Sequence, residues 1–231
     1  FGHEAVGHVV AIGKKVKKVS PNDEVILSWI KGKGLDHGGF ELTNINNQKI
    51  NFGPISTFSS FAIVSENRVF LKPKKMSKIE AVLYGCATPT GAGIVINQLK
   101  KIKKKHKVCL IGVGGVGMAA LLALIKKKPK IFVIEKNKKK KQFLKKFNIN
   151  LINDKEIKSY KNFFDFCIET SGSTKMIEGG FDLIKNDGKL IFASHPKNSK
   201  KIKLNPHDLI SGKKIYGSWG GDVLPDIDIM K

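Results

Sequence analysis

Apolar and polar positions follow two different patterns along the chain, and the change falls near residue 77. Before it, short apolar runs are separated by turn-forming residues such as the Ser20-Pro21-Asn22-Asp23 sequence. This pattern predicts strands over 9–12, 24–29, 61–64 and 69–71, with loops and short strands over 31–60. The first part of the chain is therefore expected to be rich in β-structure.

After residue 77, short apolar runs alternate with longer segments whose apolar positions recur at helical spacing. Strands are predicted over 108–111, 130–135, 163–170 and 188–195, and helices over 78–84, 88–102, 115–127, 138–147 and 174–185. Ser77 is expected to cap the first of these helices, and Thr90 to open the second. Strands that alternate with helices predict an α/β fold with a parallel, doubly wound sheet.

The composition is that of an ordinary globular protein, with 231 residues, 41% hydrophobic residues and a mean hydropathy of −0.15. Its longest apolar run, around residues 118–125, is too short to span a bilayer, and no secretory pattern opens the sequence. The three cysteines form no even disulfide framework, which favours a reducing compartment. We therefore expect a cytoplasmic protein with no membrane partner.

The net charge of +23 would ordinarily suggest a nucleic-acid ligand, but the kind of basic residue argues against one. Arg68 is the only arginine, so 41 of the 42 basic residues are lysines. Proteins that read bases or phosphates favour the bidentate guanidinium of arginine. We expect no specific nucleic-acid partner, only weak and salt-sensitive association with polyanions.

A glycine-rich turn lies between the strand predicted at 108–111 and the helix predicted at 115–127. Gly112, Gly114 and Gly117 fit the Gly-x-Gly-x-x-Gly pattern in its required strand-to-helix context. The first glycine permits the tight turn, the second lets the backbone approach a pyrophosphate, and the third lets helix and strand pack closely. The pattern therefore predicts a Rossmann domain that binds a dinucleotide at the start of this helix.

An acidic residue, Glu135, ends the next predicted strand, close to the separation expected for a ribose-binding carboxylate. It can accept hydrogen bonds from both hydroxyls of the adenosine ribose, and it would repel a 2′-phosphate. The sequence therefore favours NAD over NADP.

Six segments resemble the zinc-containing alcohol dehydrogenases of the medium-chain dehydrogenase/reductase superfamily, and together they span essentially the whole chain. They are GHEAVGHVVAIGKKVKKVSPNDEVI, STFSSFAIV, YGCATPTGAG, IGVGGVG, DFCIETSG and SGKKIYGSWGG, in the family's order. The similarity looks closest to the branch that holds the classical and the glutathione-dependent (class III) enzymes. It implies a Rossmann domain joined to a β-rich, GroES-like catalytic domain.

The resemblance also implies roles for single residues. His3 and Cys86 match two ligands of the catalytic zinc, and Glu4 matches a glutamate that can approach the metal as an alternate ligand. Thr90 matches a threonine near the nicotinamide, so the implied catalytic set is His3, Glu4, Cys86 and Thr90. The implied cofactor-binding set is Gly112, Gly114, Gly115, Val116, Gly117, Glu135, Lys140, Ser171, Phe192, Ser194 and Trp219.

These residue types suit the implied chemistry. Zinc held by thiolates and an imidazole keeps a position open for an alcohol, whose pKa it lowers before hydride passes to the nicotinamide. Cys86 alone could be a buried thiol and His3 alone a surface histidine, but together, each in its own family motif, they favour a zinc site. The remaining cysteines, Cys109 and Cys167, are expected in the core, and no ligand spacing is found for His8, His37, His106, His195 and His207.

The chain departs from the family pattern at two places. Residues 29–44 hold none of the cysteines that bind a structural zinc in the family, so we expect one catalytic zinc and no structural zinc. The family's first zinc cysteine and its proton relay precede the Gly-His-Glu segment, and its C-terminal part returns to the catalytic domain. We therefore expect a partial chain, incomplete at both ends and inactive by itself, with domains at 1–87 (GroES-like), 88–218 (Rossmann) and 219–231 (start of the return).

The sequence thus predicts a zinc-dependent oxidoreductase that transfers a hydride between an alcohol or aldehyde and NAD and forms a homo-oligomer. One alternative is a zinc-free, quinone-reductase-like member of the superfamily, a branch without counterparts of His3 and Cys86. Another is a non-catalytic nucleotide- or RNA-binding protein, which the net charge of +23 motivates.

Overall fold

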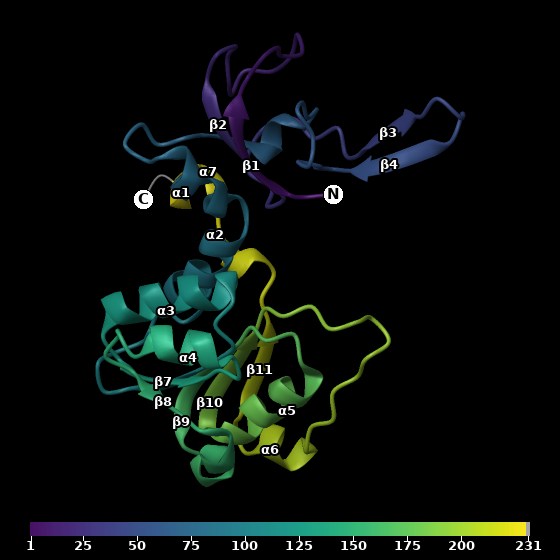
Figure 1. Cartoon of the computed structure of the whole chain (residues 1–231). Helices are drawn as coiled ribbons and strands as arrows, with labels where there is room; N and C mark the ends of the chain where they lie inside the picture. The colour runs from purple at the N-terminus through teal and green to yellow at the C-terminus, as the bar shows by residue number, and fades with distance from the viewer. Residues whose placement is uncertain (230–231) are drawn as a thin grey trace. The chain divides into compact units, whose positions relative to one another are not determined.

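The computed structural model describes residues 1–229, which divide into two compact units (Figure 1). One unit comprises residues 1–89 together with the described residues from 223 onward, and the other comprises Thr90–Asp222. The boundaries expected from the sequence, at 87/88 and 218/219, lie two and four residues from these positions.

The first unit is built on a three-stranded antiparallel sheet in the order β1-β2-β5, beside a separate β3-β4 hairpin. Its strands are β1 (Glu4–His8), β2 (Glu24–Ser28), β3 (Phe40–Thr43), β4 (Lys49–Gly53) and β5 (Val69–Leu71). Its helical segments are η1 (Glu66–Arg68), α1 (Lys78–Val82), η2 (Leu83–Gly85) and α7 (Pro225–Asp228). As predicted, Ser77 caps α1, because its hydroxyl accepts a hydrogen bond from the Glu80 N–H at 3.2 Å.

Two predicted strands of this unit are wrong. Residues 9–12 continue from β1 without strand pairing of their own, and residues 61–64 are irregular. Both segments are apolar, which is why their pattern suggested strands, yet Val10 and Ile63 are 71% and 68% exposed. The pairing falls earlier in the chain, where β1 runs beside β2 from Glu4↔Ser28 to His8↔Glu24.

A buried polar turn at 65–68 fastens the loops of the first unit. The Glu66 carboxylate accepts hydrogen bonds from the N–H groups of Lys17, Lys18 and Leu35 at 2.6–2.8 Å. Arg68, at the end of the turn, is only 6% exposed. Burial lowers the pKa of Arg68, an effect that the charge of Asp36 partly offsets.

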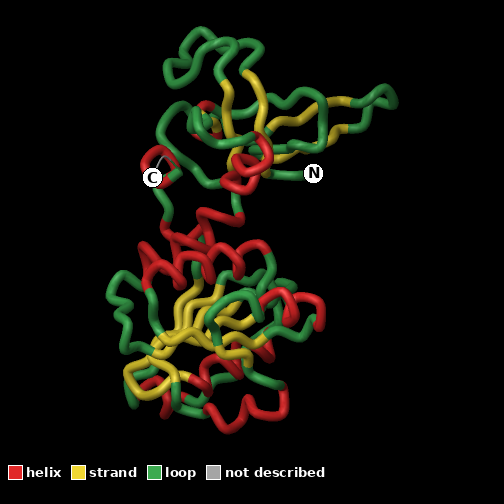
Figure 2. Tube along the Cα trace, turned by 60° about the vertical axis from the view of Figure 1, so that its left-hand side comes forward, coloured by secondary structure: helices red, strands yellow, loops and turns green. Residues whose placement is uncertain are grey.

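The second unit is a six-stranded parallel sheet in the order β11-β10-β9-β6-β7-β8, which confirms the predicted doubly wound fold (Figure 2). Its strands are β6 (Lys107–Ile111), β7 (Lys130–Ile134), β8 (Asn150–Leu151), β9 (Phe164–Glu169), β10 (Ile184–Phe192) and β11 (Lys214–Gly217). Helix α2 (Ala87–Gly93) leads into the unit and is followed by a π-helical turn, η3 (Ile94–Gln98). The other helical segments are α3 (Gly115–Lys127), α4 (Lys138–Leu144), η4 (Asp154–Tyr160), α5 (Thr174–Leu183), α6 (Pro206–Ile210) and η5 (Gly220–Asp222).

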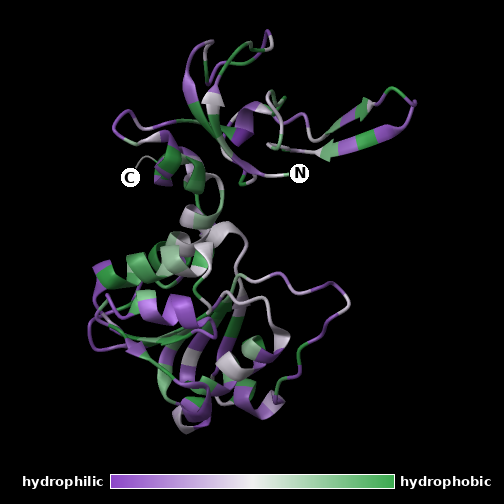
Figure 3. Ribbon diagram, viewed as in Figure 1, coloured by the Kyte–Doolittle hydropathy of each residue, from purple (hydrophilic) through white to green (hydrophobic). Residues whose placement is uncertain are grey.

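Successive residues of the central strand β6 face two different cores, as side-chain alternation in a strand requires. Val108 and Leu110 belong to the cluster that includes α3, whereas Cys109 and Ile111 belong to the cluster that includes α5. Both Cys109 and Cys167 are fully buried, which confirms their expected place in the core. Figure 3 shows α3 as mostly apolar and the lysine-rich α4 as largely hydrophilic.

Several element boundaries differ from the predicted ones. Helix α2 begins at Ala87, three residues before Thr90, and α5 ends at Leu183, where β10 begins at once. The register of β10 against β9 shifts between Ile184 and Lys189, which places an irregularity before the predicted strand. No single helix within residues 1–229 is long and apolar enough to cross a membrane. The two helical segments Lys78–Gly85 and Ala87–Gln98, which are bent against each other, reach that length and apolarity only together.

Candidate functional site

The predicted dinucleotide turn lies where β6 ends and α3 begins. Gly112 has φ +80°, a conformation that favours glycine, and its N–H donates to the Ile134 carbonyl at 2.9 Å. A Cβ on Gly117 would lie 2.2 Å from the Gly112 carbonyl oxygen, so a side chain there would separate helix and turn. A Cβ on Gly114 would meet no atom within 4 Å, and the backbone there is open to a ligand.

Helix α3 presents its first N–H groups at this turn. Its first three residues are Gly115, Val116 and Gly117, whose N–H groups precede the first helical hydrogen bond, from Met118 to Gly114 at 2.8 Å. These donors and the helix dipole suit an anionic pyrophosphate. Gly91 of α2 supports the turn, because a Cβ there would lie 2.0 Å from the Val116 carbonyl oxygen.

Glu135 follows β7 directly and is held against the glycine turn. It is 7% exposed, and its carboxylate accepts hydrogen bonds from the N–H groups of Val113 at 2.8 Å and Asn137 at 2.9 Å. Burial alone would raise the pKa of Glu135, but these N–H groups and the positive charge of Lys140 lower it below its usual value. The ionised carboxylate keeps lone pairs for further donors.

These features fit the dinucleotide that the motif predicts. The sheet order places β6 and β7 side by side, so the glycine turn and Glu135 share the carboxyl edge where dinucleotides bind in doubly wound folds. The open space at Gly114 is where a pyrophosphate would approach the backbone. The acceptor at Glu135 is where a ribose would donate.

Ser171 and Ser194 lie at the ends of β9 and β10, and one buried carboxylate joins them. The Glu169 carboxylate accepts hydrogen bonds from the N–H and hydroxyl of Ser171 and from the hydroxyl of Ser194. Glu169 itself is fully buried. Sequence reasoning missed Glu169; the available signal was an acid at the end of a buried strand, just as at Glu135.

The other residues assigned to the nicotinamide end have different surroundings. Phe192 packs partly buried against the α5-side core, whereas Trp219 is 70% exposed and its ring lies 5.3 Å from the His195 ring, edge to face. Thr90 lies within α2 and is buried, and its Oγ1 has no hydrogen-bond partner among the described residues. The structure therefore brings Ser171 and Ser194 together through Glu169 and places Phe192 partly buried at the end of β10.

In the first unit, the segments that carry the implied metal ligands are in contact. The Glu4 carboxylate accepts a hydrogen bond from the Ala87 N–H at 2.9 Å, and a Cβ on Gly85 would lie 3.0 Å from the Glu4 Cα. The hydroxyl of Ser28 on β2 donates to the Gly85 carbonyl at 2.6 Å and fixes the same segment. His3 and Cys86 are the neighbours of these anchored residues, and His3 is exposed whereas Cys86 is half-buried.

The donor types at this place fit zinc, which favours thiolate and imidazole ligands. Their number does not complete a site, since no group of three or more metal-binding side chains occurs within residues 1–229. The described residues therefore offer two of the ligand types that a catalytic zinc requires, with Glu4 beside them.

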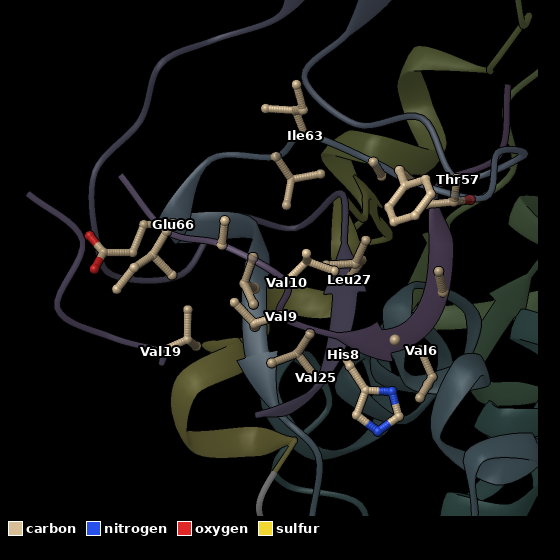
Figure 4. Close-up of a pocket in the computed structure, with 18 of the residues that line it drawn as sticks. Val6, His8, Val9, Val10, Val19, Val25, Leu27, Thr57, Ile63 and Glu66 are labelled. Atoms are coloured by element: carbon tan, nitrogen blue, oxygen red, sulfur yellow. The ribbon is translucent and has the colours of Figure 1, made fainter. Parts of the chain in front are cut away.

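An apolar cavity of about 630 Å³ also lies in the first unit (Figure 4). Its lining includes Val9, Val10, Val25 and Leu27 on one side and Ile63 on another, while His3, Glu4 and Cys86 are not part of it. It brings together the two segments, 9–12 and 61–64, whose strand prediction was wrong. Its polar lining comes from residues such as His8, Thr57 and Glu66, none of which is assigned to the predicted chemistry.

Comparison with known proteins places these features in a family. The chain matches the alcohol dehydrogenase GroES-like domain over residues 1–74 and the zinc-binding dehydrogenase family over residues 115–229. The S-(hydroxymethyl)glutathione dehydrogenase of Saccharomyces cerevisiae is 26% identical over 265 residues, which cover 96% of this chain and 68% of that protein. The Escherichia coli enzyme of the same name is 26% identical over 259 residues, covering 96% of this chain and 70% of that protein.

A solved structure agrees with the sequence matches. Benzyl alcohol dehydrogenase from Acinetobacter calcoaceticus superimposes with a TM-score of 0.84 at 25% identity, over 100% of this chain and 71% of that chain. The chain therefore belongs to the zinc-type alcohol dehydrogenases of the medium-chain dehydrogenase superfamily. Proteins of this class are NAD-dependent oxidoreductases, and these matches favour the zinc-dependent prediction over its two alternatives.

Proposed function

We propose that this chain provides the NAD-binding cradle and two zinc ligands of a dehydrogenase that interconverts a small alcohol and its aldehyde. The observation that carries the proposal is the presence of two features in one chain, one in each unit. One is a glycine turn with Glu135 bonded across it, and the other is the contact of Glu4 with the Cys86 segment. In the oxidative direction, the alcohol loses a hydride to NAD and a proton to solvent.

Each residue has a definite task in this proposal. His3 and Cys86 would hold the metal, and Glu4, anchored on the Ala87 N–H, would stay beside it as an alternate ligand. When bound, zinc would polarise the substrate oxygen and NAD would accept the hydride. Gly112, Gly114, Gly115, Val116 and Gly117 would bind the pyrophosphate, and Thr90, Lys140, Ser171, Phe192, Ser194 and Trp219 would border the rest of the cofactor.

Glu135 supports NAD as the preferred cofactor. Its ionised carboxylate can accept both ribose hydroxyls, and it would repel the phosphate of NADP. Burial would raise the pKa of Glu135, but the N–H groups of Asn137 and Val113, together with the charge of Lys140, lower it and so favour the ionised carboxylate at neutral pH. Selection against NADP therefore depends on this group.

The metal assignment is tested by substitution in the full protein. His3→Ala or Cys86→Ala should abolish stoichiometric zinc binding, measured by elemental analysis, and should leave NAD binding within about twofold. His8→Ala is the matched control, because His8 is an exposed histidine that pairs with Glu24 at 3.4 Å, and zinc should be retained. Full zinc content in both ligand variants would refute the assignment.

The number of metal ions is a further part of the proposal. We expect about one zinc ion per chain, because residues 29–44 have no cysteine for a structural site. A measured content of two ions per chain would contradict this. The ion should leave on treatment with a chelator, whereas NAD binding should persist.

We also propose that the protein forms a homo-oligomer and is cytoplasmic. A homo-oligomer is supported by apolar side chains on the β3-β4 hairpin, where Leu42 and Ile45 are 53% and 98% exposed. Light scattering on the full protein would test this.

A cytoplasmic location is supported by three reduced cysteines, Cys86, Cys109 and Cys167, and imaging of the tagged protein would test it.

A further inference from the structure

The Glu169 carboxyl group is fully buried and has an unusual set of neighbours. It accepts three hydrogen bonds, two from Ser171 and one from Ser194. No lysine, arginine or histidine within residues 1–229 forms an ion pair with it. A buried carboxylate is costly unless a cation compensates it, so this arrangement calls for a positive charge that the described residues do not supply.

Glu169 occupies a definite place at the carboxyl edge of the sheet. It ends β9 opposite Ile111, the last residue of β6, and opposite Phe192, the last residue of β10. Strands β9 and β10 lie on one side of β6, and β7 with Glu135 lies on the other. The two acids therefore flank the glycine turn.

The same segment is locked to that turn. The Thr170 hydroxyl donates to the Gly112 carbonyl at 2.7 Å, and a Cβ on Gly112 would lie 3.0 Å from Ser171. If the adenosine half of the cofactor lies over β7 and its pyrophosphate at the turn, the nicotinamide half extends over β9 and β10. Glu169 lies beneath that half.

We propose that Glu169 is a positioning residue that favours the oxidised cofactor, a proposal that rests on the NAD-binding function above. The nicotinamide ring of NAD⁺ carries a positive charge and that of NADH does not. A carboxylate in a site of low dielectric therefore stabilises the oxidised form selectively. Because Glu169 is buried, it acts through its field and through the two serines.

This arrangement also fixes the hydrogen-bonding role of Ser171 and Ser194. The hydroxyls of Ser171 and Ser194 both donate to Glu169, so each oxygen can act toward a ligand as an acceptor only. They suit a ligand that donates, such as the amide –NH₂ of a nicotinamide. Glu169 thus sets both the charge and the hydrogen-bonding polarity of this half of the site.

The test measures the affinities for NAD⁺ and NADH separately in the full protein, by calorimetry and by NADH fluorescence. Glu169→Gln keeps the side-chain shape and removes the charge, so the Kd for NAD⁺ should rise about three- to tenfold while that for NADH changes less than twofold. Equal weakening of both forms would indicate a merely structural role and would overturn the proposal. An unchanged ratio would overturn it as well.

Two further variants serve as a control and as a second test of the charge effect. Asp165→Asn removes the same charge near the opposite end of β9, where Asp165 pairs with Lys185, and should leave the ratio unchanged. If Glu169→Gln does not fold, Ser171→Lys places an ammonium group beside the carboxylate at an exposed position and should shift the ratio in the same direction. Failure of the wild-type protein to bind either cofactor form would instead count against the proposed function itself.

Discussion

Glu135 shows how much a single side chain can depend on backbone donors. Its carboxylate is bonded to Val113 in the turn and to Asn137 at the N-cap of α4, so the acid also fixes the shape of its own surroundings. Removing the Glu135 side chain would therefore have two effects, the loss of a contact with the ligand and the loosening of the turn. A comparison of NAD with NADP separates these effects, because only the ligand contact distinguishes the ribose of NAD from the phosphorylated ribose of NADP.

We predict that Glu135→Ala weakens NAD binding by about tenfold, the effect of losing hydrogen bonds to a charged acceptor. NADP should bind more tightly to this variant than to the wild type, because the repulsive charge is gone. The measurement is a pair of dissociation constants for NAD and NADP. Asp182→Ala, an exposed acid on α5, is the control and should change neither value. A fixed NAD-to-NADP ratio would contradict the ribose-binding role.

At the scale of elements, the contact between α2 and α3 depends on glycine. A Cβ on Gly91 would lie 2.0 Å from the Val116 carbonyl oxygen and 2.8 Å from the Ala119 Cβ, so any side chain there must push the helices apart. Gly179 lies inside α5 with no atom within 4 Å of an added Cβ. Both glycines lie in helices, but only at Gly91 would a side chain clash with a neighbouring helix.

This contrast gives a paired prediction. Gly91→Ala should lower the free energy of unfolding of the second unit by about 2–3 kcal/mol, through overpacking at the helix contact. Gly179→Ala should raise it by about 0.5–1 kcal/mol, because alanine favours the helix and meets no obstacle. Denaturant titration followed by circular dichroism would measure both. Equal changes of the two variants would show that space at Gly91 is not limiting.

The parallel sheet could be predicted because β6, β7 and β9 are buried on both faces and read as continuous apolar runs between helices. The strands at 9–12 and 61–64 could not be excluded, since an apolar run does not show whether a segment has a pairing partner, and Val10 and Ile63 are mostly exposed. The short β8 and β11 were missed because two and four residues carry too little pattern. Glu169 was missed because its partners, Ser171 and Ser194, are 23 residues apart in sequence and meet only when β9 and β10 pair.

At the scale of the whole molecule, the first unit combines two parts of the chain that are far apart in sequence, residues 1–89 and the described residues from 223 onward. Asp226 lies at the start of α7, yet its carboxylate pairs with Lys18 at 2.6 Å and accepts the Lys33 N–H at 2.6 Å. Ile229 joins Ile26, Phe70 and Ala81 in a buried cluster. The end of the described chain is thus part of the fold of its beginning.

We predict that Asp226→Asn lowers the stability of the first unit by about 1 kcal/mol at neutral pH. Burial alone would raise the pKa of Asp226, but Lys18 and the Lys33 N–H lower it below its usual value. The contribution is therefore full above the pKa of the unfolded state and is lost as pH falls through the lower, folded-state pKa, so wild type and variant should converge in acid.

Unfolding followed by Trp29 fluorescence in a Trp219→Phe background would report on the first unit, because these are the chain's two tryptophans. Glu41→Gln breaks the exposed Glu41–Lys49 pair on the hairpin and should have no measurable effect. A difference between wild type and Asp226→Asn that persists unchanged in acid would contradict the ionic explanation.

Arg68 has one more consequence, for the cleavage of the chain by proteases. A protease that cuts only after arginine has a single target bond, since every other basic residue is lysine. That bond lies in a turn whose arginine is buried, so the folded chain should resist a cut that would release pieces of 68 and 163 residues. The appearance of these two pieces therefore reports, by one unambiguous band pattern on a gel, how often this part of the molecule opens.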